Sequence, residues 1–338
     1  MEKRFPSSLF LSLSLALLLF STKSSDALEV EFYKNRKLCP DVEKIVRKTV
    51  LSYYKNDPTI TAPLLRLHFH DCFVEGCDGS VLINSTMSNV AEKDAKPNLS
   101  LDGFDVIDKA KEELEAKCPG VVSCADIVAL AARDAVSLAT YVVRSGKWSK
   151  DYNMYEVETG RRDGRVSSAS NAIKNLPSSF WGIYQLKKSF ASKGLNLKDL
   201  AVLSAAHTIG NSHCNSFAKR LYNYTGKGDM DPSLLPSYAA NLTKICTPTD
   251  NTTVLEMVPG SSTTFDTTYF KLVTEEKGLF HSDQALLRSQ VTRNYVFSHV
   301  SNSTGFFYDF GISMVKMGRN KVLEGKYGEI RKNCAVIN

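Results

Sequence analysis

Residues 66–73 read RLHFHDCF, and this stretch carries the densest chemistry in the chain. If the segment is helical, Arg66 and His70 are four residues apart and share one face, whereas His68 points elsewhere. That face joins a permanent cation to an imidazole that titrates near neutral pH. The pair suits peroxide cleavage, because His70 can move a proton between two oxygens while Arg66 stabilises the developing charge. Taken alone, the motif also fits a solvated helix face.

The loop that follows this segment is rich in oxygen ligands. Asp71, Asp78 and Ser80 offer carboxylate and hydroxyl oxygens, and a bond between Cys72 and Cys77 would hold the loop closed. Calcium takes six to eight oxygen ligands. The loop therefore favours a hard cation, with a polar surface turn as the alternative.

A second histidine lies in the stretch LKDLAVLSAAHTIG, residues 197–210. His207 continues the apolar stripe of Leu200 and Leu203, and the small residues 204–206 leave room for a bulky group. A histidine is a common ligand of haem iron. A satisfied core histidine is the alternative.

The N-terminus has the pattern of a secretory signal. Lys3 and Arg4 precede an apolar run over residues 9–20, and small residues follow at 25–27. The run is shorter than the roughly 20 residues that span a bilayer, and no later stretch is apolar enough. We therefore expect a signal peptide over residues 1–27 and one secreted domain over residues 28–338.

The eight cysteines and the sequons also fit secretion. An even number of cysteines in an oxidising compartment predicts four disulfides. Eight cysteines permit 105 pairings, and only Cys72 and Cys77 are close enough to suggest a local bond. No Cys-x-x-Cys pair supports zinc. The six Asn-x-Ser/Thr sequons begin at Asn84, Asn98, Asn223, Asn241, Asn251 and Asn302.

Composition limits the classes of partner. The formal net charge is +6 over 338 residues, with 43% apolar residues. The basic residues are dispersed, which argues against nucleic-acid binding. We expect a monomer without a membrane partner, and weak attraction to an acidic wall polysaccharide is the one further contact that the charge favours.

The apolar periodicity predicts a mostly helical chain. The expected helices cover residues 41–54, 104–116, 124–139, 184–193, 197–207, 214–224, 265–277, 289–301 and 304–317. The pattern over 124–139 is apolar nearly all round, which predicts a buried helix. Short strands are expected at 156–159 and 321–323, and irregular loops at 141–155 and 227–259.

Taken together, these motifs resemble the class III, secreted plant-type haem peroxidases. The matching stretches, in the family's order, are RLHFHDCF (66–73), GCD (76–78), EKD (92–94), VSCAD (122–126), GRRD (160–163), LSAAHT (203–208), FD (265–266) and SDQ (282–284). They cover essentially the whole mature chain. The resemblance implies an all-α, two-lobed fold with one non-covalent haem b between the lobes.

The resemblance also implies roles for individual residues. His70, Arg66 and Asn98 would form the catalytic group, with Asn98 hydrogen-bonded to His70. His207 would bind the iron, and Asp283 would accept the other ring N–H of His207. The resemblance also implies one substrate contact, the backbone carbonyl of Pro177.

Calcium ligands and disulfides are implied in the same way. A distal calcium would use Asp71, Val74, Gly76, Asp78 and Ser80, and a proximal calcium would use Thr208, Ser261, Thr264 and Asp266. The implied disulfides are Cys39–Cys118, Cys72–Cys77, Cys124–Cys334 and Cys214–Cys246.

Three features depart from the family pattern. Val258 stands where a proximal calcium carboxylate is usual, so we expect a firm distal site and a weak proximal one. Asp102 replaces the usual arginine before Gly103. The loop over residues 141–151 is longer than usual and lacks the common Gly-Gly-Pro.

The expected activity is reduction of hydrogen peroxide with one-electron oxidation of small phenolic or aromatic donors. Within the family this serves cell-wall phenolic metabolism, lignification and the response to oxidative stress, in the wall, the apoplast or the vacuole. Two other classes compete. A metal-dependent hydrolase would use His68, His70 and Asp71, but the other histidines of the sequence supply no obvious set of further ligands. A calcium-binding wall glycoprotein without catalysis would not need Arg66, His70 and His207 together.

Overall fold

The computed structural model describes residues 28–145 and 153–338, and helices dominate it. The expected signal peptide, residues 1–27, lies outside the described residues. The helices are α1 (Phe32–Asn35), α2 (Val42–Asn56), α3 (Thr61–Phe73), α4 (Phe104–Lys117), α5 (Cys124–Ser145), α6 (Ala169–Asn175), α7 (Ile183–Ala191), α8 (Leu197–Ser204), α9 (Ala218–Tyr222), α10 (Pro236–Leu242), α11 (Thr268–Thr274), α12 (His281–Ala285), α13 (Gln290–His299) and α14 (Ser303–Gly318). The all-α prediction is confirmed.

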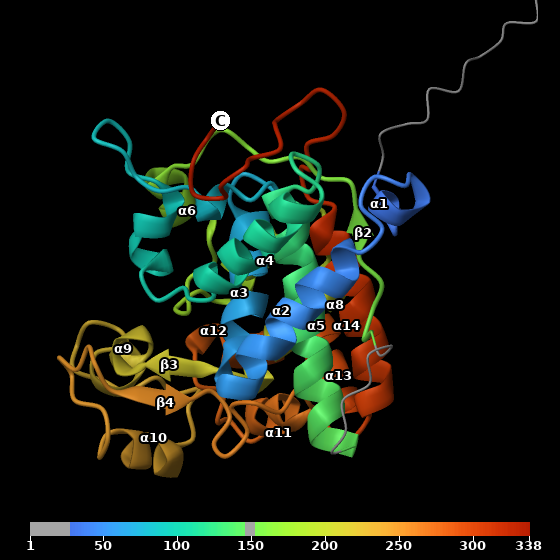
Figure 1. Ribbon diagram of the computed structural model, residues 1–338. Coiled ribbons are helices and arrows are strands. Elements are labelled where there is room, and N and C mark those ends of the chain that lie inside the picture. Colours follow the sequence, from blue (N-terminus) through green and yellow to red (C-terminus); the bar gives the residue numbers. More distant parts are fainter. Residues whose placement is uncertain (1–27, 146–152) are drawn as a thin grey trace, which may run out of the picture.

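In the part of the chain that the structure describes, strands form only two small antiparallel pairs. β1 (Glu29–Val30) pairs with β2 (Glu158–Thr159), and β3 (Asn211–His213) pairs with β4 (Val254–Glu256). Figure 1 shows β3 and β4 beside α9 and α10 in the lower part of the molecule, while α3, α4 and α6 lie above them. Across residues 28–145 and 153–338, no helix combines the length and apolar composition needed to cross a membrane.

Helix α5 is buried because it lies between two hydrophobic clusters. Ile127 and Leu130 pack with α2 and α4, whereas Val136 and Ala139 pack with the aromatic cluster of α11 and α14. A helix with apolar neighbours on both sides needs an apolar surface nearly all round. This explains the pattern that the sequence shows over residues 124–139.

Helix α3 is held between the same two clusters. Leu64 and Leu67 join the cluster of α2 and α4, and Leu65 and Phe73 join the other. These four side chains fix the rotation of the helix about its axis. The rotation decides where His70 points, so burial of the leucines positions the chemistry.

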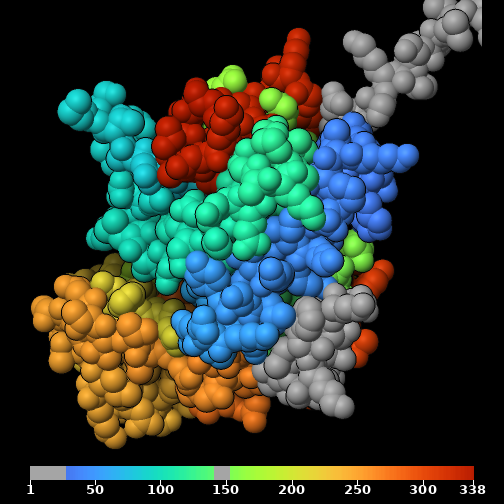
Figure 2. Space-filling model, in the orientation of Figure 1, coloured from blue at the N-terminus to red at the C-terminus, as the bar shows by residue number. Residues whose placement is uncertain are grey.

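The C-terminal segment folds back on the N-terminal part of the chain. Arg331 is fully buried and donates from Nη2 to the carbonyl of Gly79 at 2.6 Å. The amide of Asn84 donates to the carbonyl of Ala335 at 3.0 Å. Figure 2 shows the red C-terminal residues at the top of the molecule, beside the cyan and green residues of the first half.

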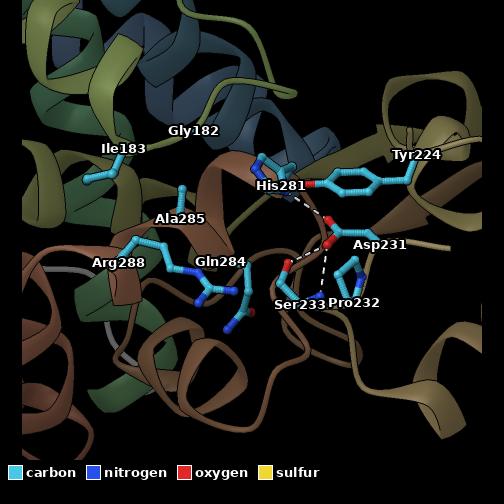
Figure 3. Close-up of a pocket in the computed structure, with 10 residues that line it drawn as sticks. All are labelled: Gly182, Ile183, Tyr224, Asp231, Pro232, Ser233, His281, Gln284, Ala285 and Arg288. Carbon is cyan, nitrogen blue, oxygen red and sulfur yellow. Dashed lines mark hydrogen bonds and ion pairs between the residues drawn. The ribbon is translucent and has the colours of Figure 1, made fainter. Parts of the chain in front are cut away.

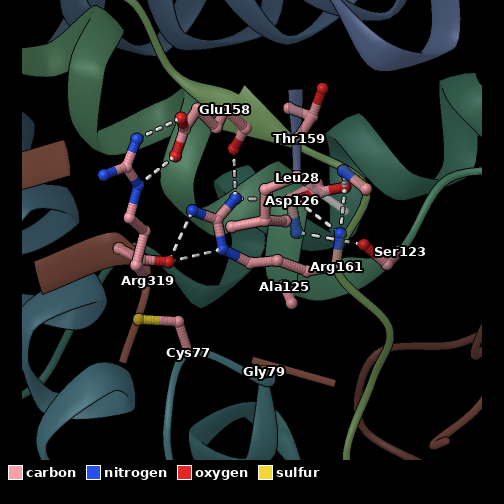
Figure 4. A network of polar contacts seen from close by, with 12 residues as sticks. Leu28, Cys77, Gly79, Ser123, Ala125, Asp126, Glu158, Thr159, Arg161 and Arg319 are labelled. Atoms are coloured by element: carbon pink, nitrogen blue, oxygen red, sulfur yellow. Dashed lines mark hydrogen bonds and ion pairs between the residues drawn. The ribbon is translucent and has the colours of Figure 1, made fainter. Parts of the chain in front are cut away.

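A buried ion pair ties the VSCAD and GRRD motifs together. Arg161 donates from Nη1 to Asp126 Oδ1 at 2.8 Å, and its Nη2 donates to the carbonyl of Gly318 at 2.7 Å. Beside it, Arg319 pairs with Glu158 on β2 at 2.5 Å (Figure 4). The network joins α5, β2 and the end of α14. These motifs therefore serve the fold and lie outside the catalytic group.

Four disulfides close the structure, and they are the pairs that the resemblance implies: Cys39–Cys118, Cys72–Cys77, Cys124–Cys334 and Cys214–Cys246. Such bonds persist in oxidising compartments. Cys124–Cys334 fastens α5 to the C-terminal segment, and Cys72–Cys77 closes the loop after α3.

Several expected boundaries were wrong. α5 continues to Ser145, into the expected loop at 141–155, because its sequence contains no glycine or proline to end it. Residues 146–152 of that loop lie outside the described residues. The expected loop at 227–259 contains α10, which starts with Pro236 at a favoured first position, and also contains β4. Residues 321–323 make only a single bridge, from Leu323 to Arg162.

The expected helix at 214–224 is also interrupted. A short 3-10 turn covers Cys214–Ser216, and α9 starts at Ala218. Between them Phe217 has φ −139°, which is outside the helical range.

Candidate active site

The structure brings His70 and Asn98 into direct contact. His70 lies near the end of α3, and Asn98 ends the 3-10 turn Lys96–Asn98. Asn98 Oδ1 lies 2.6 Å from His70 Nδ1, and Asn98 Nδ2 donates to the carbonyl of Glu92 at 2.8 Å. His70 and Asn98 are 5% and 2% exposed, so neither contact competes with bulk water.

These contacts determine the tautomer of His70. The Glu92 carbonyl can only accept, so it fixes the Asn98 amide with Oδ1 toward the ring. His70 Nδ1 must then donate, which leaves the lone pair on Nε2. Burial, followed by the charge of Arg66, holds the pKa of His70 well below its usual value, and the bond to Asn98 raises it in part. The ring is therefore a neutral base at neutral pH.

Arg66 is held by two backbone carbonyls and one hydroxyl, and no carboxylate of the described residues pairs with it. Its Nη1 donates to the Ser100 carbonyl at 2.9 Å and to Ser100 Oγ at 3.1 Å, and its Nη2 donates to the Pro97 carbonyl at 2.8 Å. Burial lowers the pKa of Arg66 to about 10, so the guanidinium remains charged at neutral pH. Sequence reasoning missed Pro97 and Ser100, whose only signal is that they flank Asn98.

The second histidine pairs with a buried carboxylate. α8 starts with a capping box between Asn196 and Asp199, and a 3-10 turn, Ala205–Thr208, follows it. This turn carries His207, whose Nδ1 lies 2.7 Å from Oδ1 of Asp283 on α12. Asp283 is 1% exposed, whereas the side chain of His207 is 37% exposed. The carboxylate can only accept, so Nδ1 donates and Nε2 is free to bind a group.

Tyr269 and Phe280 complete the surroundings of Asp283. Tyr269 Oη donates to the same Oδ1 at 3.1 Å, and the Phe280 amide donates to Oδ2 at 2.8 Å. The Phe280 ring packs edge-on against His207, with centroids 5.2 Å apart. The apolar side chain of Phe280 and the distant position of Tyr269 gave no sequence signal for these roles.

The two histidine-bearing segments share one hydrophobic cluster. Phe69 and Phe73 of α3 pack in the same cluster as Ala205 and Ala206. The histidines are 137 positions apart in the chain, so only the tertiary fold brings their elements together.

Comparison with known proteins agrees with this geometry. The peroxidase family model matches residues 46–302. Peroxidase 27 of Arabidopsis thaliana is 54% identical over 323 residues, which are 95% of this chain and 96% of that protein. Peroxidase 1 of rice is 50% identical over 333 residues, which are 96% of this chain and 98% of that protein.

The chain belongs to the peroxidase family. The resemblance to class III plant peroxidases is thereby confirmed, and the protein is a peroxidase enzyme. The family implies hydrogen peroxide and a reducing substrate. It also implies a haem cofactor. The residues fit one, because His207 Nε2 has no partner among the described residues, and an imidazole nitrogen is a usual iron ligand in peroxidases.

The loop after α3 in this peroxidase is a buried acidic cluster. Asp71 Oδ2 accepts from the amide of Gly79 at 3.0 Å, and Asp78 Oδ1 accepts from the amide of Ser80 at 3.1 Å. Ser80 Oγ and both carboxylate oxygens of Glu92 are buried with no partner. Burial raises the pKa of Asp78 to about 6 and that of Glu92 to about 9. Buried oxygens without donors suit a cation.

The loop needs glycine at two positions. Gly76 has φ +128°, and a Cβ there would lie 2.7 Å from the carbonyl oxygen of Lys321. Gly79 has φ +68°, and a Cβ there would lie 2.6 Å from Arg331 Nη2. Any side chain would disturb the loop, because both the conformation and the space exclude it.

The corresponding loop beside His207 is different. Asp266 accepts from Thr208 Oγ1 at 2.9 Å, from Thr268 Oγ1 at 3.0 Å and from the Thr268 amide at 2.8 Å. Val258 is 1% exposed and packs in the hydrophobic core. Glu256 accepts from the amide of Gly260 in its own turn.

The remaining predicted site residues lie as follows. Pro177 is half-buried just after α6, and Ser261 Oγ donates to the Thr264 carbonyl at 3.4 Å. Val74 is the residue directly after the end of α3. Across residues 28–145 and 153–338, no group of three His, Cys, Asp or Glu side chains is arranged to hold a metal. A cation in the acidic loop would therefore need backbone and hydroxyl oxygens as well.

Proposed function

We propose that this enzyme is a secreted peroxidase that reduces hydrogen peroxide and oxidises small phenolic donors by one-electron steps. The contact between Asn98 and His70 carries this proposal, because it leaves a basic lone pair on a buried imidazole beside a permanent cation. General acid–base catalysis needs such a group. A metal-dependent hydrolase is disfavoured, since His68 Nδ1 lies 3.7 Å from Cys72 Sγ, inside the fold.

The distal residues would handle the proton and the charge. His70 Nε2 takes the proton from the near oxygen of hydrogen peroxide and returns it to the far oxygen, which leaves as water. Arg66 stabilises the negative charge on the departing oxygen. A bound haem supplies the electrons for O–O cleavage. Asn98 holds the proton on His70 Nδ1 throughout, so Nε2 is the nitrogen that takes and returns the proton.

The proximal residues would hold the haem iron and tune it. His207 Nε2 is the proposed ligand. Asp283 accepts from Nδ1 and so increases the electron density of the imidazole. The carbonyl of Pro177 is the proposed contact for the phenolic hydroxyl, which donates to it.

Calcium binding is proposed mainly for the acidic loop. Asp71 and Asp78 would supply carboxylates, and Val74, Gly76 and Ser80 would supply carbonyl or hydroxyl oxygens. The partnerless Ser80 Oγ and the raised pKa of Asp78 support this site. The set of Thr208, Ser261, Thr264 and Asp266 is proposed as a weak site, since its only carboxylate already accepts three hydrogen bonds.

Secretion to the wall, the apoplast or the vacuole is proposed from the predicted signal and supported by the four disulfides. The physiological setting that we propose is cell-wall phenolic metabolism, including lignification and the response to oxidative stress.

Purified enzyme with haem should oxidise a simple phenol such as guaiacol only when hydrogen peroxide is present. His70→Ala should keep the haem absorption band but slow the reaction with peroxide by about 10²–10⁴-fold or more. His213→Ala is the matched control, because His213 lies on β3 and is none of the residues proposed for the catalytic group. Near wild-type rates in His70→Ala would overturn the proposal, and absence of peroxide-dependent oxidation in the wild type would favour the non-catalytic class.

A further inference from the structure

A cavity of about 200 Å³ lies beside α12, outside the residues assigned above to haem, peroxide or calcium. Its lining comes from the start of α7, from the loop after α9 and from α12 with the turn that follows it. Figure 3 shows Ile183 and Arg288 on one side, Tyr224 on the other and His281 between them. Ligand sites combine apolar walls with a few convergent polar groups, and this cavity has both.

His281 is oriented by a buried carboxylate. Its Nδ1 lies 2.8 Å from Asp231 Oδ2, and Asp231 is fully buried. A carboxylate can only accept, so Nδ1 donates and Nε2 presents its lone pair. His281 Nε2 lies 4.0 Å from the position of a Cβ at Gly182, which also lines the cavity. His281 thus offers the cavity an acceptor for a hydroxyl group.

A buried arginine already balances the charge of Asp231. Arg220, which is also fully buried, donates from Nε to Asp231 Oδ2 at 2.7 Å. Ser233 donates its amide and its hydroxyl to Oδ1 at 2.9 and 2.6 Å. Burial favours the neutral acid, but the bonds from His281, Ser233 and Arg220 together hold the pKa of Asp231 below its usual value. Asp231 is therefore not a partner for a second cation.

Arg288 supplies a cation without a carboxylate. Within the described part of the chain, no Asp or Glu forms an ion pair with Arg288, whose side chain is exposed at the edge of the cavity. A guanidinium matches the two oxygens of a carboxylate in its fork of donors. The cavity therefore has a place for one carboxylate.

We propose that this cavity binds a small aromatic acid that carries both a hydroxyl and a carboxylate. The carboxylate pairs with Arg288, the hydroxyl donates to His281 Nε2, and the ring packs between Ile183 and Tyr224. The volume admits one ring, since it is below the roughly 300–1,000 Å³ of sites for larger ligands. The site is separate from Arg66 and His70, and the proposal does not depend on the proposed catalytic cycle.

Titration calorimetry of the haem-loaded enzyme without peroxide tests the proposal. The probes are 4-hydroxybenzoate, benzoate, which lacks the hydroxyl, and phenol, which lacks the carboxylate. Wild type should bind 4-hydroxybenzoate at least tenfold more tightly than either of the others. Arg288→Ala should remove this preference over phenol, and Arg293→Ala, which changes an exposed arginine on the neighbouring α13, should keep it.

Ile183→Trp provides a second variant that fills the cavity and leaves the charges in place. It should abolish the 4-hydroxybenzoate binding that Arg288→Ala weakens, while both variants keep peroxide-dependent phenol oxidation. Wild-type affinity in both variants would overturn the site. Equal losses in Arg288→Ala and Arg293→Ala would also overturn it, because they would show attraction to surface charge in general. If the wild type does not oxidise phenol with peroxide, that result would contradict the proposed function and leave the cavity proposal unaffected.

Discussion

Asn98 Oδ1 lies 2.6 Å from His70 Nδ1, and the other end of the Asn98 amide donates to the carbonyl of Glu92. The amide is therefore held at both ends, and it fixes which nitrogen of His70 carries the proton. The tautomer of the proposed base depends on one side chain 28 positions further along the chain.

Removal of the Asn98 amide should shift the pH profile of the reaction rate with peroxide in a defined direction. The bond to Asn98 raises the pKa of His70, so Asn98→Val lowers it. The protonated, inactive form then appears only at lower pH, and the acid limb of the rate with peroxide shifts down the pH scale. The plateau should fall about fivefold, because a lost hydrogen bond of about 1 kcal/mol weakens the base. Rapid-mixing rates from pH 3 to 8 check this, and an acid limb that moves upward would contradict it.

Asn98 should carry no glycan although it begins a sequon. Its side chain is 2% exposed and both ends of its amide are bonded inside the fold. Asn241 and Asn251 are exposed and serve as internal references. Peptide mapping of protein from a plant host, before and after enzymatic deglycosylation, should find glycan at one or more exposed sequons and none at Asn98. Substantial occupancy at Asn98 would contradict its place beside His70.

His207→Ala should lose or loosen haem, because it removes the only nitrogen proposed to bind the iron. Added imidazole should restore part of the haem absorption by taking the vacated position. His213→Ala and His299→Ala should keep full haem content. Haem-to-protein ratios after gel filtration provide the measurement, and a wild-type ratio and spectrum in His207→Ala would exclude it as the ligand.

Tyr269→Phe should lower the iron midpoint potential by an amount on the order of tens of millivolts. Tyr269 Oη and His207 Nδ1 donate to the same Asp283 oxygen, at 3.1 and 2.7 Å. Without the phenol, more of the carboxylate charge is directed to His207, which then stabilises the oxidised iron. Tyr295→Phe is the control, since Tyr295 Oη donates to Asp309 and not to Asp283. Equal shifts of the midpoint potential in both variants would show that Tyr269 has no specific role.

The two proposed calcium sites should differ in strength. Dialysis against a mild chelator should leave one calcium per molecule by metal analysis. Val258→Asp should destabilise the calcium-free protein by about 3 kcal/mol, because it places a carboxylate in a hydrophobic cluster, and calcium should reverse this loss. Val254→Asp adds the same charge at a position that is 47% exposed and should show neither effect. Two calcium ions retained equally by the wild type would show that Val258 is unimportant.

The sequence by itself determined the family, the fold class and most of the proposed catalytic group. The spacing of Arg66 and His70 is local, so helical geometry places both on one face without knowledge of the rest of the chain. Val258 could likewise be recognised as a missing carboxylate. Helix ends were predicted less well, because packing and backbone conformation decide where α5 ends and where α9 begins. Phe217, for example, has a φ outside the helical range directly before α9.

Only the tertiary structure decided which distant groups complete each site. The bonds of Arg66 to the Pro97 and Ser100 carbonyls, and of Tyr269 to Asp283, join residues 31, 34 and 14 positions apart. Backbone carbonyls occur at every residue, so no side-chain pattern can mark those that become acceptors. The pairing of Asp231 with both Arg220 and His281 arises in the same way, from burial that leaves each polar group in need of a partner.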